Sequence, residues 1–112
     1  MEHRLKRQRD FDTVFLKGKK AFTENLTMIY FKRRFGETKI GVSVGKKHGK
    51  AVVRNRIKRL LRAVYIPMLP SIKESYFIVF LPKIKDSYSF DNFKKSVGYL
   101  LKRENLIDEF FQ

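Results

Sequence analysis

Residues 39–66, KIGVSVGKKHGKAVVRNRIKRLLRAVYI, change their hydrophobic period halfway along the stretch. At first, apolar side chains alternate with glycine and serine, which is the period of two expected of a strand. From residue 51, the apolar side chains instead share one stripe of a helical wheel at about 100° per residue, namely Val53, Ile57, Leu60, Leu61 and Val64. The stretch therefore predicts a strand over residues 39–45, a basic loop over 46–50 and a helix over 51–66.

The segments before this stretch predict a short helix and a strand. Residues 10–17 have apolar side chains at i, i+3 and i+4, so we expect a helix capped by Asp10 and ended by a left-handed Gly18. Residues 26–32, LTMIYFK, are rich in strand-forming side chains. We expect them to form an antiparallel hairpin with residues 39–45, and we interpret residues 19–24 as a basic connection.

The segments after the stretch predict one buried strand and one more long helix. Pro67 and Pro70 should end the helix, because proline lacks the N–H and clashes with the preceding turn. The apolar run YFIVFL, residues 76–81, is typical of a strand buried on both faces at the centre of a sheet. A helix over residues 89–102 and a short helical turn within 105–111 complete the chain.

The predicted order is α-β-β-α-β-α, which is an α+β sandwich with a small mixed sheet and packed helices. A chain of 112 residues suits one domain, so we interpret residues 1–112 as a single domain. The long helix joins the hairpin to the buried strand, and one strand pairing can therefore be parallel. The sequence leaves the strand order open.

The charge is unevenly distributed along the chain. Residues 1–62 hold 19 Lys and Arg against 5 Asp and Glu, whereas residues 63–112 hold 7 against 6. Such a basic half favours a polyanionic partner, because Lys and Arg that neutralise phosphates release condensed counterions. A nucleic acid is favoured over a membrane surface, since the basic residues alternate with the apolar pattern of a folded domain.

The outward side of the 51–66 helix lacks the acidic side chains that usually offset such charge. Exposed helices normally mix signs, because like charges repel at i, i+4. Here we expect the phosphates of a nucleic acid to supply the missing negative charge, because arginine binds a phosphate with two parallel hydrogen bonds. The candidates are Arg54, Asn55, Arg56, Lys58, Arg59 and Arg62. A solvated basic helix with Asn55 as a bystander is the alternative.

The stretch GVSVGKKHGKAVVRNRIKRLLR, residues 41–62, resembles the signature of the protein subunit of bacterial ribonuclease P. That family carries a Gly-x-Ser/Thr-Val strand, a Lys-Lys pair and a helix with Arg-Asn-Arg, then Lys-Arg and a further Arg. The opening RLKRQRDFDTVFLKG, residues 4–18, is also similar to the family's opening. The resemblance covers about residues 4–102, and the acidic, apolar end NLIDEFFQ departs from the basic ends of many members.

The resemblance implies a protein cofactor of a catalytic RNA that removes the 5′ leader of precursor transfer RNA with magnesium ions. The RNA would perform the hydrolysis and bind most of the Mg²⁺. The fold implied is similar to that of the second domain of ribosomal protein S5. The helix candidates would then contact the catalytic RNA, and a cleft beside the sheet would take the leader through Phe11, Phe15, Lys46 and Lys47.

Two assignments within this cleft stay open. Phenylalanines at i, i+4 usually belong to a core, so Phe11 and Phe15 are weighed evenly between core packing and stacking on leader bases. In the strand over residues 26–31, either Thr27 and Ile29 or Met28 and Tyr30 can face the cleft, because a one-residue slip inverts the faces.

Chemistry carried by the chain itself is not expected. Two-metal nucleases need clustered acids, and the basic half holds Glu2, Asp10, Asp12, Glu24 and Glu37 without such a cluster. We therefore expect no catalytic residue and no metal site in the protein. We also expect no membrane or DNA partner and a cytoplasmic location. The competing interpretations are a ribosomal or generic structured-RNA-binding protein and, less favoured, a nuclease that works without RNA.

Overall fold

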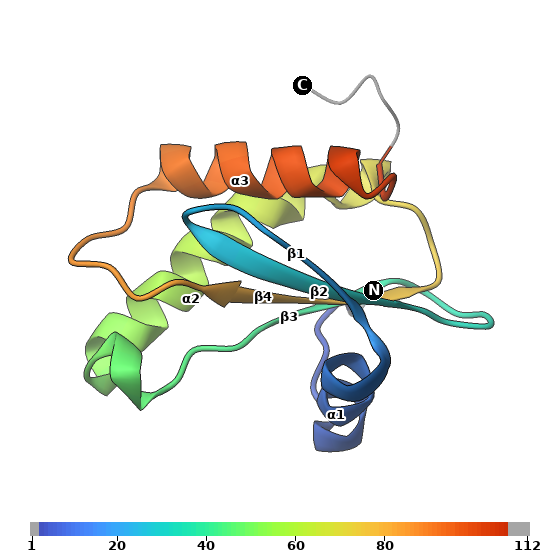
Figure 1. Ribbon diagram of the computed structural model, residues 1–112, viewed down its shortest axis with the longest axis horizontal. Helices are drawn as coiled ribbons and strands as arrows, with labels where there is room; N and C mark the ends of the chain where they lie inside the picture. The colour runs from blue at the N-terminus through green and yellow to red at the C-terminus, as the bar shows by residue number, and fades with distance from the viewer. Residues whose placement is uncertain (1–2, 108–112) are drawn as a thin grey trace.

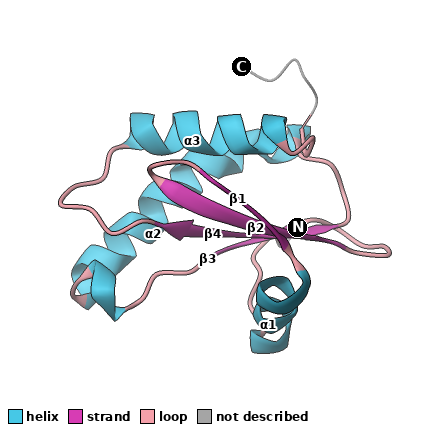
Figure 2. Ribbon diagram, viewed as in Figure 1, coloured by secondary structure: helices cyan, strands magenta, loops and turns pink. Residues whose placement is uncertain are grey.

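The computed structural model describes residues 3–107 and shows four strands, three helices and two short 3₁₀ helices in this range (Figure 2). The strands are β1 (Lys19–Phe22), β2 (Leu26–Lys32), β3 (Lys39–Val42) and β4 (Tyr76–Pro82). The helices are α1 (Gln8–Lys17), α2 (Ala51–Tyr65) and α3 (Phe90–Arg103), with 3₁₀ helices η1 (Lys46–His48) and η2 (Ile66–Ser71). No helix among the described residues is long and apolar enough to cross a membrane.

The strands form one mixed sheet in the order β1-β2-β4-β3. Strand β4 pairs antiparallel with β2 from Leu26↔Pro82 to Lys32↔Tyr76. On its other side β4 pairs parallel with β3. The prediction of a buried central strand is therefore confirmed, and so is the α+β class with a mixed sheet.

The predicted hairpin between residues 26–32 and 39–45 is wrong. Strand β2 has β1 and β4 as its neighbours, and β3 lies beyond β4. The seven-residue strand β4 matches β2 along its full length, whereas β3 pairs over only four residues. The long connection through α2 then carries the chain from β3 to β4, as a parallel pairing requires.

The interpretation of residues 19–24 as a connection is also wrong, because Lys19–Phe22 forms the edge strand β1. Of its four side chains, Ala21 alone is buried, so the segment has no apolar alternation that could have been recognised. Lysines on an exposed edge strand disfavour pairing with other chains. The two lysines that suggested a loop are therefore compatible with an edge strand.

Helix α1 begins earlier than predicted, at Gln8, with Arg7 at the N-cap position. Asp10 is not the cap but lies in the first turn, where a carboxylate interacts favourably with the helix dipole. Gly18 ends the helix with φ of −74°, so the predicted left-handed conformation is wrong. The glycine instead allows close packing, since a Cβ there would lie 2.7 Å from Cγ2 of Ile29.

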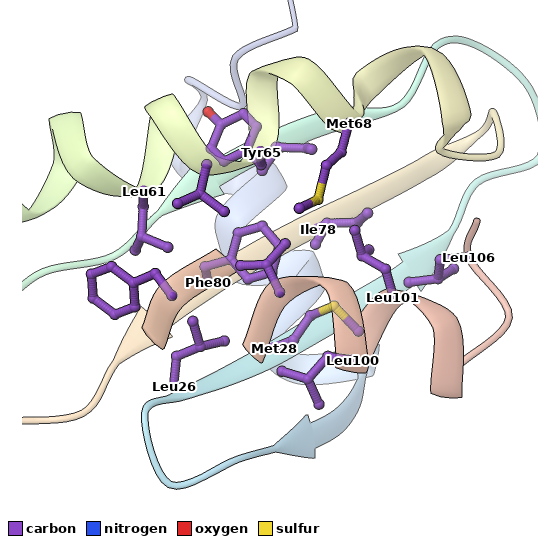
Figure 3. Close-up of a cluster of buried hydrophobic side chains, with 14 of the residues drawn as sticks. Leu26, Met28, Leu61, Tyr65, Met68, Ile78, Phe80, Leu100, Leu101 and Leu106 are labelled. Carbon is purple, nitrogen blue, oxygen red and sulfur yellow. The ribbon is translucent and has the colours of Figure 1, made fainter. Parts of the chain in front are cut away.

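The sheet separates the helices into two layers, with α2 and α3 on one face and α1 on the other (Figure 1). The larger core lies on the α2 and α3 face (Figure 3). Its fully buried members include Leu61, Met28, Phe80 and Leu100. A smaller cluster on the α1 face contains Leu5, Val14, Ile29, Phe77 and Val79. The α1 face is therefore the less thickly covered side of the sheet.

Helix α3 has a well-formed cap at each end. The side chain of Ser89 accepts a hydrogen bond from the backbone N–H of Asn92 at the start. At the end Asn105 adopts a left-handed φ of 63°, and the N–H of Leu106 donates to the carbonyl of Leu101. The predicted helical turn within 105–111 is wrong for residues 105–107, and its remaining residues lie outside the described range.

Candidate RNA interface

The apolar stripe of α2 holds the helix to the sheet. Ile57, Leu61 and Val64 are buried, and Val53 and Leu60 pack partly buried against the same core. This confirms the stripe predicted from the helical wheel. It also leaves the basic side chains of the helix outside the core.

The six predicted RNA-binding side chains of α2 lie at two depths. Asn55, Arg56 and Arg59 are exposed, whereas Arg54, Lys58 and Arg62 are half-buried at the margin of the stripe. The half-buried three recur every four residues, so they form one row along the helix. The helix thus presents an exposed surface and, beside it, a row of cations partly sheltered by the fold.

This charge has no counterpart within the described part of the chain. The ion pair found there joins Arg103 to Glu104 in α3, and none of the α2 cations shares one with a described residue. The Nε atom of Arg54 is buried without a hydrogen-bond acceptor from residues 3–107. An unsatisfied buried donor costs about 1–3 kcal/mol, so the fold does not benefit from this hydrogen-bond donor.

A groove of about 280 Å³ connects the α2 row to the α1 face of the sheet. Lys58 and Arg62 line it on the α2 side, and Phe11 lines it on the α1 side. The ring of Phe11 lies over Gly41 of β3, where a Cβ would come within 2.7 Å of the ring atom Cζ. The groove thus brings together candidates from α1 and from α2, which lie far apart in the sequence.

The two phenylalanines of α1 lie at the edge of the smaller cluster. Val14 is the fully buried side chain of the helix, and Phe11 is only partly buried against the cluster. Phe15 is 39% exposed. The two rings stack with centroids 6.4 Å apart and an angle of 26° between their planes. Phe15 therefore offers ring surface to solvent, which a core residue would not.

The α1 face of the sheet continues beyond the helix as an open surface. Thr27, Ile29 and Phe31 of β2 point to this face, because Ile29 belongs to the α1 cluster while Met28 belongs to the larger core. The sequence left open which side chains of this strand face the α1 side, and the structure shows that Thr27 and Ile29 do so rather than Met28 and Tyr30. Past α1 lies a shallow hollow of about 580 Å³, lined by Thr27, Leu81, Ser43, Lys83 and neighbouring residues.

The basic loop η1 is held at the end of β4 by His48. The Nε2 atom of His48 lies 2.6 Å from the carbonyl oxygen of Pro82, and the N–H of Gly45 donates to Nδ1 at 3.2 Å. These two contacts assign the proton of a neutral ring to Nε2, which donates to Pro82. Lys46 and Lys47 are exposed in this loop, beside the hollow that His48 also lines.

The N-terminal segment lies along the outer edge of β3, a contact that was not predicted from the sequence. The N–H of Leu5 donates to the carbonyl of Ile40, and the N–H of Ile40 donates to the carbonyl of His3. Leu5 is buried in the α1 cluster, and Arg4 and Lys6 line the groove next to α2. The single apolar residue in a basic run was the available signal for this contact.

The described residues contain no group of three His, Cys, Asp or Glu side chains arranged to hold a metal ion. Asn55 lies between Arg54 and Arg56 on α2, a donor set that does not suit direct ligation of a divalent cation. Its amide can instead bond a phosphate, a 2′-hydroxyl or a metal-bound water.

These features define a class. The protein is a small α+β RNA-binding protein whose basic helix and open sheet face meet along one edge. Comparison with known proteins narrows the class further. A sequence model of the family described as Ribonuclease P matches residues 1–105.

Curated relatives and solved structures agree with this match. The ribonuclease P protein component of Oceanobacillus iheyensis is 37% identical over 109 residues, covering 95% of this chain and 89% of that protein. That of Dictyoglomus turgidum is 45% identical over 73 residues, covering 65% of this chain and 61% of that protein. The solved structure of the RNase P protein from Thermotoga maritima superposes with a TM-score of 0.79 at 30% identity, covering 89% of this chain and 96% of that one.

The chain therefore belongs to the ribonuclease P protein family. Membership assigns it to RNA binding and transfer RNA processing, as the protein component of an endoribonuclease complex. The resemblance recognised in residues 4–102 is thereby confirmed.

Proposed function

We propose that this protein binds a catalytic RNA through α2 and the 5′ leader of precursor transfer RNA through the α1 face of its sheet. The RNA would then cleave the leader in a magnesium-dependent reaction in the cytoplasm. The observation that carries the proposal is the groove lined by Phe11, Lys58 and Arg62. It makes the basic helix and the open face one continuous surface.

Helix α2 supplies the contact with the catalytic RNA. The planar guanidinium groups of Arg56 and Arg59 are exposed and can each bind a phosphate with two parallel hydrogen bonds. Because the helix carries cations without acidic partners among the described residues, binding should release counterions and depend strongly on salt.

The α1 face supplies the contact with the leader. Phe15 has exposed ring area for stacking with a base, and stacking tolerates any sequence because every base has a π-face. Lys46 and Lys47 stand at the far end of the same face, where η1 follows β3. There they would neutralise leader phosphates. Such contacts suit a single strand whose sequence varies between substrates.

Magnesium belongs to the RNA in this proposal. The described residues hold no ligand cluster for the ion, and the surface that meets the RNA is cationic. The protein would act on the ion indirectly, by neutralising phosphates so that the folded RNA needs fewer free cations. Asn55 can add a hydrogen bond to a metal-bound water at this contact.

Truncation of Phe15 tests the leader contact. Phe15→Ala in the reconstituted holoenzyme should weaken binding of precursor transfer RNA by about 5- to 150-fold, the worth of one base stack. Binding of mature transfer RNA, which lacks the leader, should be unchanged. Leu16→Ala is the matched control, since Leu16 is the next residue of α1 and 84% exposed.

Two outcomes of this test contradict the proposal. Equal losses for precursor and mature transfer RNA would assign Phe15 to packing. Equal affinity of the wild-type protein for any structured RNA, together with sedimentation with ribosomes, would favour a generic RNA-binding protein.

A further inference from the structure

Phe22, the last residue of the edge strand β1, is an exposed aromatic side chain on the open face of the sheet. It pairs with Thr27 in the β1–β2 register, and Thr27 lines the hollow beyond α1. Residues directly opposite each other in an antiparallel pair point to the same face. Phe22 therefore lies on the α1 side of the sheet, at the edge farthest from β3.

The packing of the molecule does not account for Phe22. It is 66% exposed and belongs to neither of the two apolar clusters. Its neighbour Ala21 is the β1 residue that packs into the core. An aromatic ring on an exposed edge strand also favours association with other chains. A smaller or polar residue would serve the fold at this position.

Lys83 gives this ring a cationic neighbour. Its Nζ atom lies over one face of the Phe22 ring, 4.7 Å from the centroid, and its backbone N–H donates to the carbonyl of Asn25, which fixes the chain just after β4. Lys83 also lines the hollow with Thr27 and Leu81. With the ammonium group over one face of the ring, the other face can stack with a base, and the ammonium group can bind the phosphate of that nucleotide by charge.

The strand register shows where this pair lies relative to the part of the sheet that α1 covers. Ile29 and Val79 lie opposite each other beneath α1. Thr27 and Leu81 form the next same-face pair, two residues or about 6.5 Å farther along the strands. Phe22 extends this second row by one strand, and Ser43 lies at its β3 end. The second row thus runs across the sheet beside the row that α1 covers, with Phe22 exposed and Thr27, Leu81 and Ser43 half-buried.

We propose that Phe22 and Lys83 form a second stacking platform, which takes an upstream nucleotide of single-stranded leader RNA after the strand has passed Phe11 and Phe15. The inference rests on the proposed function, and it adds the β1 edge to the leader path. A leader that ends before the second row gains nothing from the platform. Affinity for the precursor should therefore increase with leader length until the strand reaches Phe22.

The test measures affinity of the wild-type and variant holoenzymes for precursors with leaders of increasing length and for mature transfer RNA. Phe22→Ala should weaken long-leader precursors by about 5- to 150-fold and leave short-leader precursors and mature transfer RNA unchanged. Phe22→Trp should restore the affinity, because a larger ring stacks at least as well. Phe35→Ala is the matched control, since Phe35 is also a strongly exposed phenylalanine, at 79%, but lies in the loop between β2 and β3.

An abasic nucleotide supplies a second, independent readout. Scanning it along the leader should find one position at which the loss of the base and Phe22→Ala each weaken binding, yet together cost no more than either alone. Additive losses at every position would overturn the platform. So would an equal loss for short and long leaders, or a loss of affinity for the catalytic RNA alone.

The outcomes also separate this inference from the proposed function. Failure of the wild-type holoenzyme to prefer precursor over mature transfer RNA overturns the leader contact as a whole. A normal preference that Phe22→Ala does not alter overturns the platform only. Because Phe22 is largely exposed, we expect its variants to fold with an unchanged melting temperature.

Discussion

Gly41 and Phe11 meet where the α1 face of the sheet approaches α2. The ring of Phe11 occupies the space that a side chain at Gly41 would fill, and it lines the same groove as Lys58 and Arg62. A glycine in β3 is unfavourable for a strand on entropic grounds. At this position it gives the aromatic ring room to lie against the sheet, and so it helps to shape the groove.

Substituting this glycine tests the contact. Gly41→Ala places a methyl group 2.7 Å from Cζ of Phe11, so the ring must move and the free energy of unfolding should fall by about 1–3 kcal/mol. Precursor affinity should fall with it, while binding of the catalytic RNA by α2 should persist. Chemical denaturation and binding titrations measure the two effects.

Gly45→Ala is the control for this substitution, because a Cβ at Gly45 meets open space among the described residues. We expect it to leave stability and affinity unchanged. A neutral Gly41→Ala would contradict the assigned position of Phe11.

Helix α2 is the element that the sequence described most completely. Its apolar stripe and its ends depend on local periodicity and proline, both of which can be read from neighbouring residues. The hairpin and β1 could not be predicted in the same way. Strand pairing depends on the competition among distant segments. Strand β4 pairs with β2 over seven positions, and this match cannot be predicted from the residues next to either strand.

The α2 surface leads to a prediction on salt dependence. Arg56→Ala should weaken binding of the catalytic RNA and reduce the slope of log K against log salt by about one, because one phosphate contact is lost. Lys95→Ala, which removes an exposed cation from α3, is the control and should leave the slope unchanged. Equal changes for both variants would mean that net charge, rather than the α2 surface, determines binding.

Strand β2 and the end of α3 are joined by a single strong hydrogen bond. The hydroxyl of Tyr30 donates to Oε1 of Glu104 at 2.5 Å. Burial of the phenol, and then this hydrogen bond, raise the pKa of Tyr30 from 10.0 to about 12. The folded protein therefore holds the phenol proton more tightly than the unfolded chain does.

The sign of the resulting pH dependence follows from linkage. The stabilisation is complete below pH 10.0, where Tyr30 is protonated in both states, and it is lost as the pH rises towards about 12. Tyr30→Phe removes this contribution. Denaturation curves of both proteins across this interval should converge as the pH rises, and a constant difference between them would contradict the assigned role of the hydrogen bond.

At the scale of the whole molecule, one face of the sheet carries the larger core and the other face carries the proposed leader-binding surface. The larger core, with α2 and α3, lies on one face, and the α1 face is left thinly covered. Helix α2 belongs to both parts, since its apolar stripe packs in the core and its basic residues border the α1 face at the groove. The roles of these residues were predicted from family resemblance, but their connection through the groove required the fold.

The measurement that most directly tests this account is reconstitution with the cognate catalytic RNA at a magnesium concentration too low for that RNA to act alone. With the protein added, single-turnover cleavage of precursor transfer RNA should yield the mature 5′ end. An unrelated small protein of similar net charge, added as a control, should not restore cleavage. If this protein changes neither the cleavage rate nor the precursor affinity, the proposed function is contradicted.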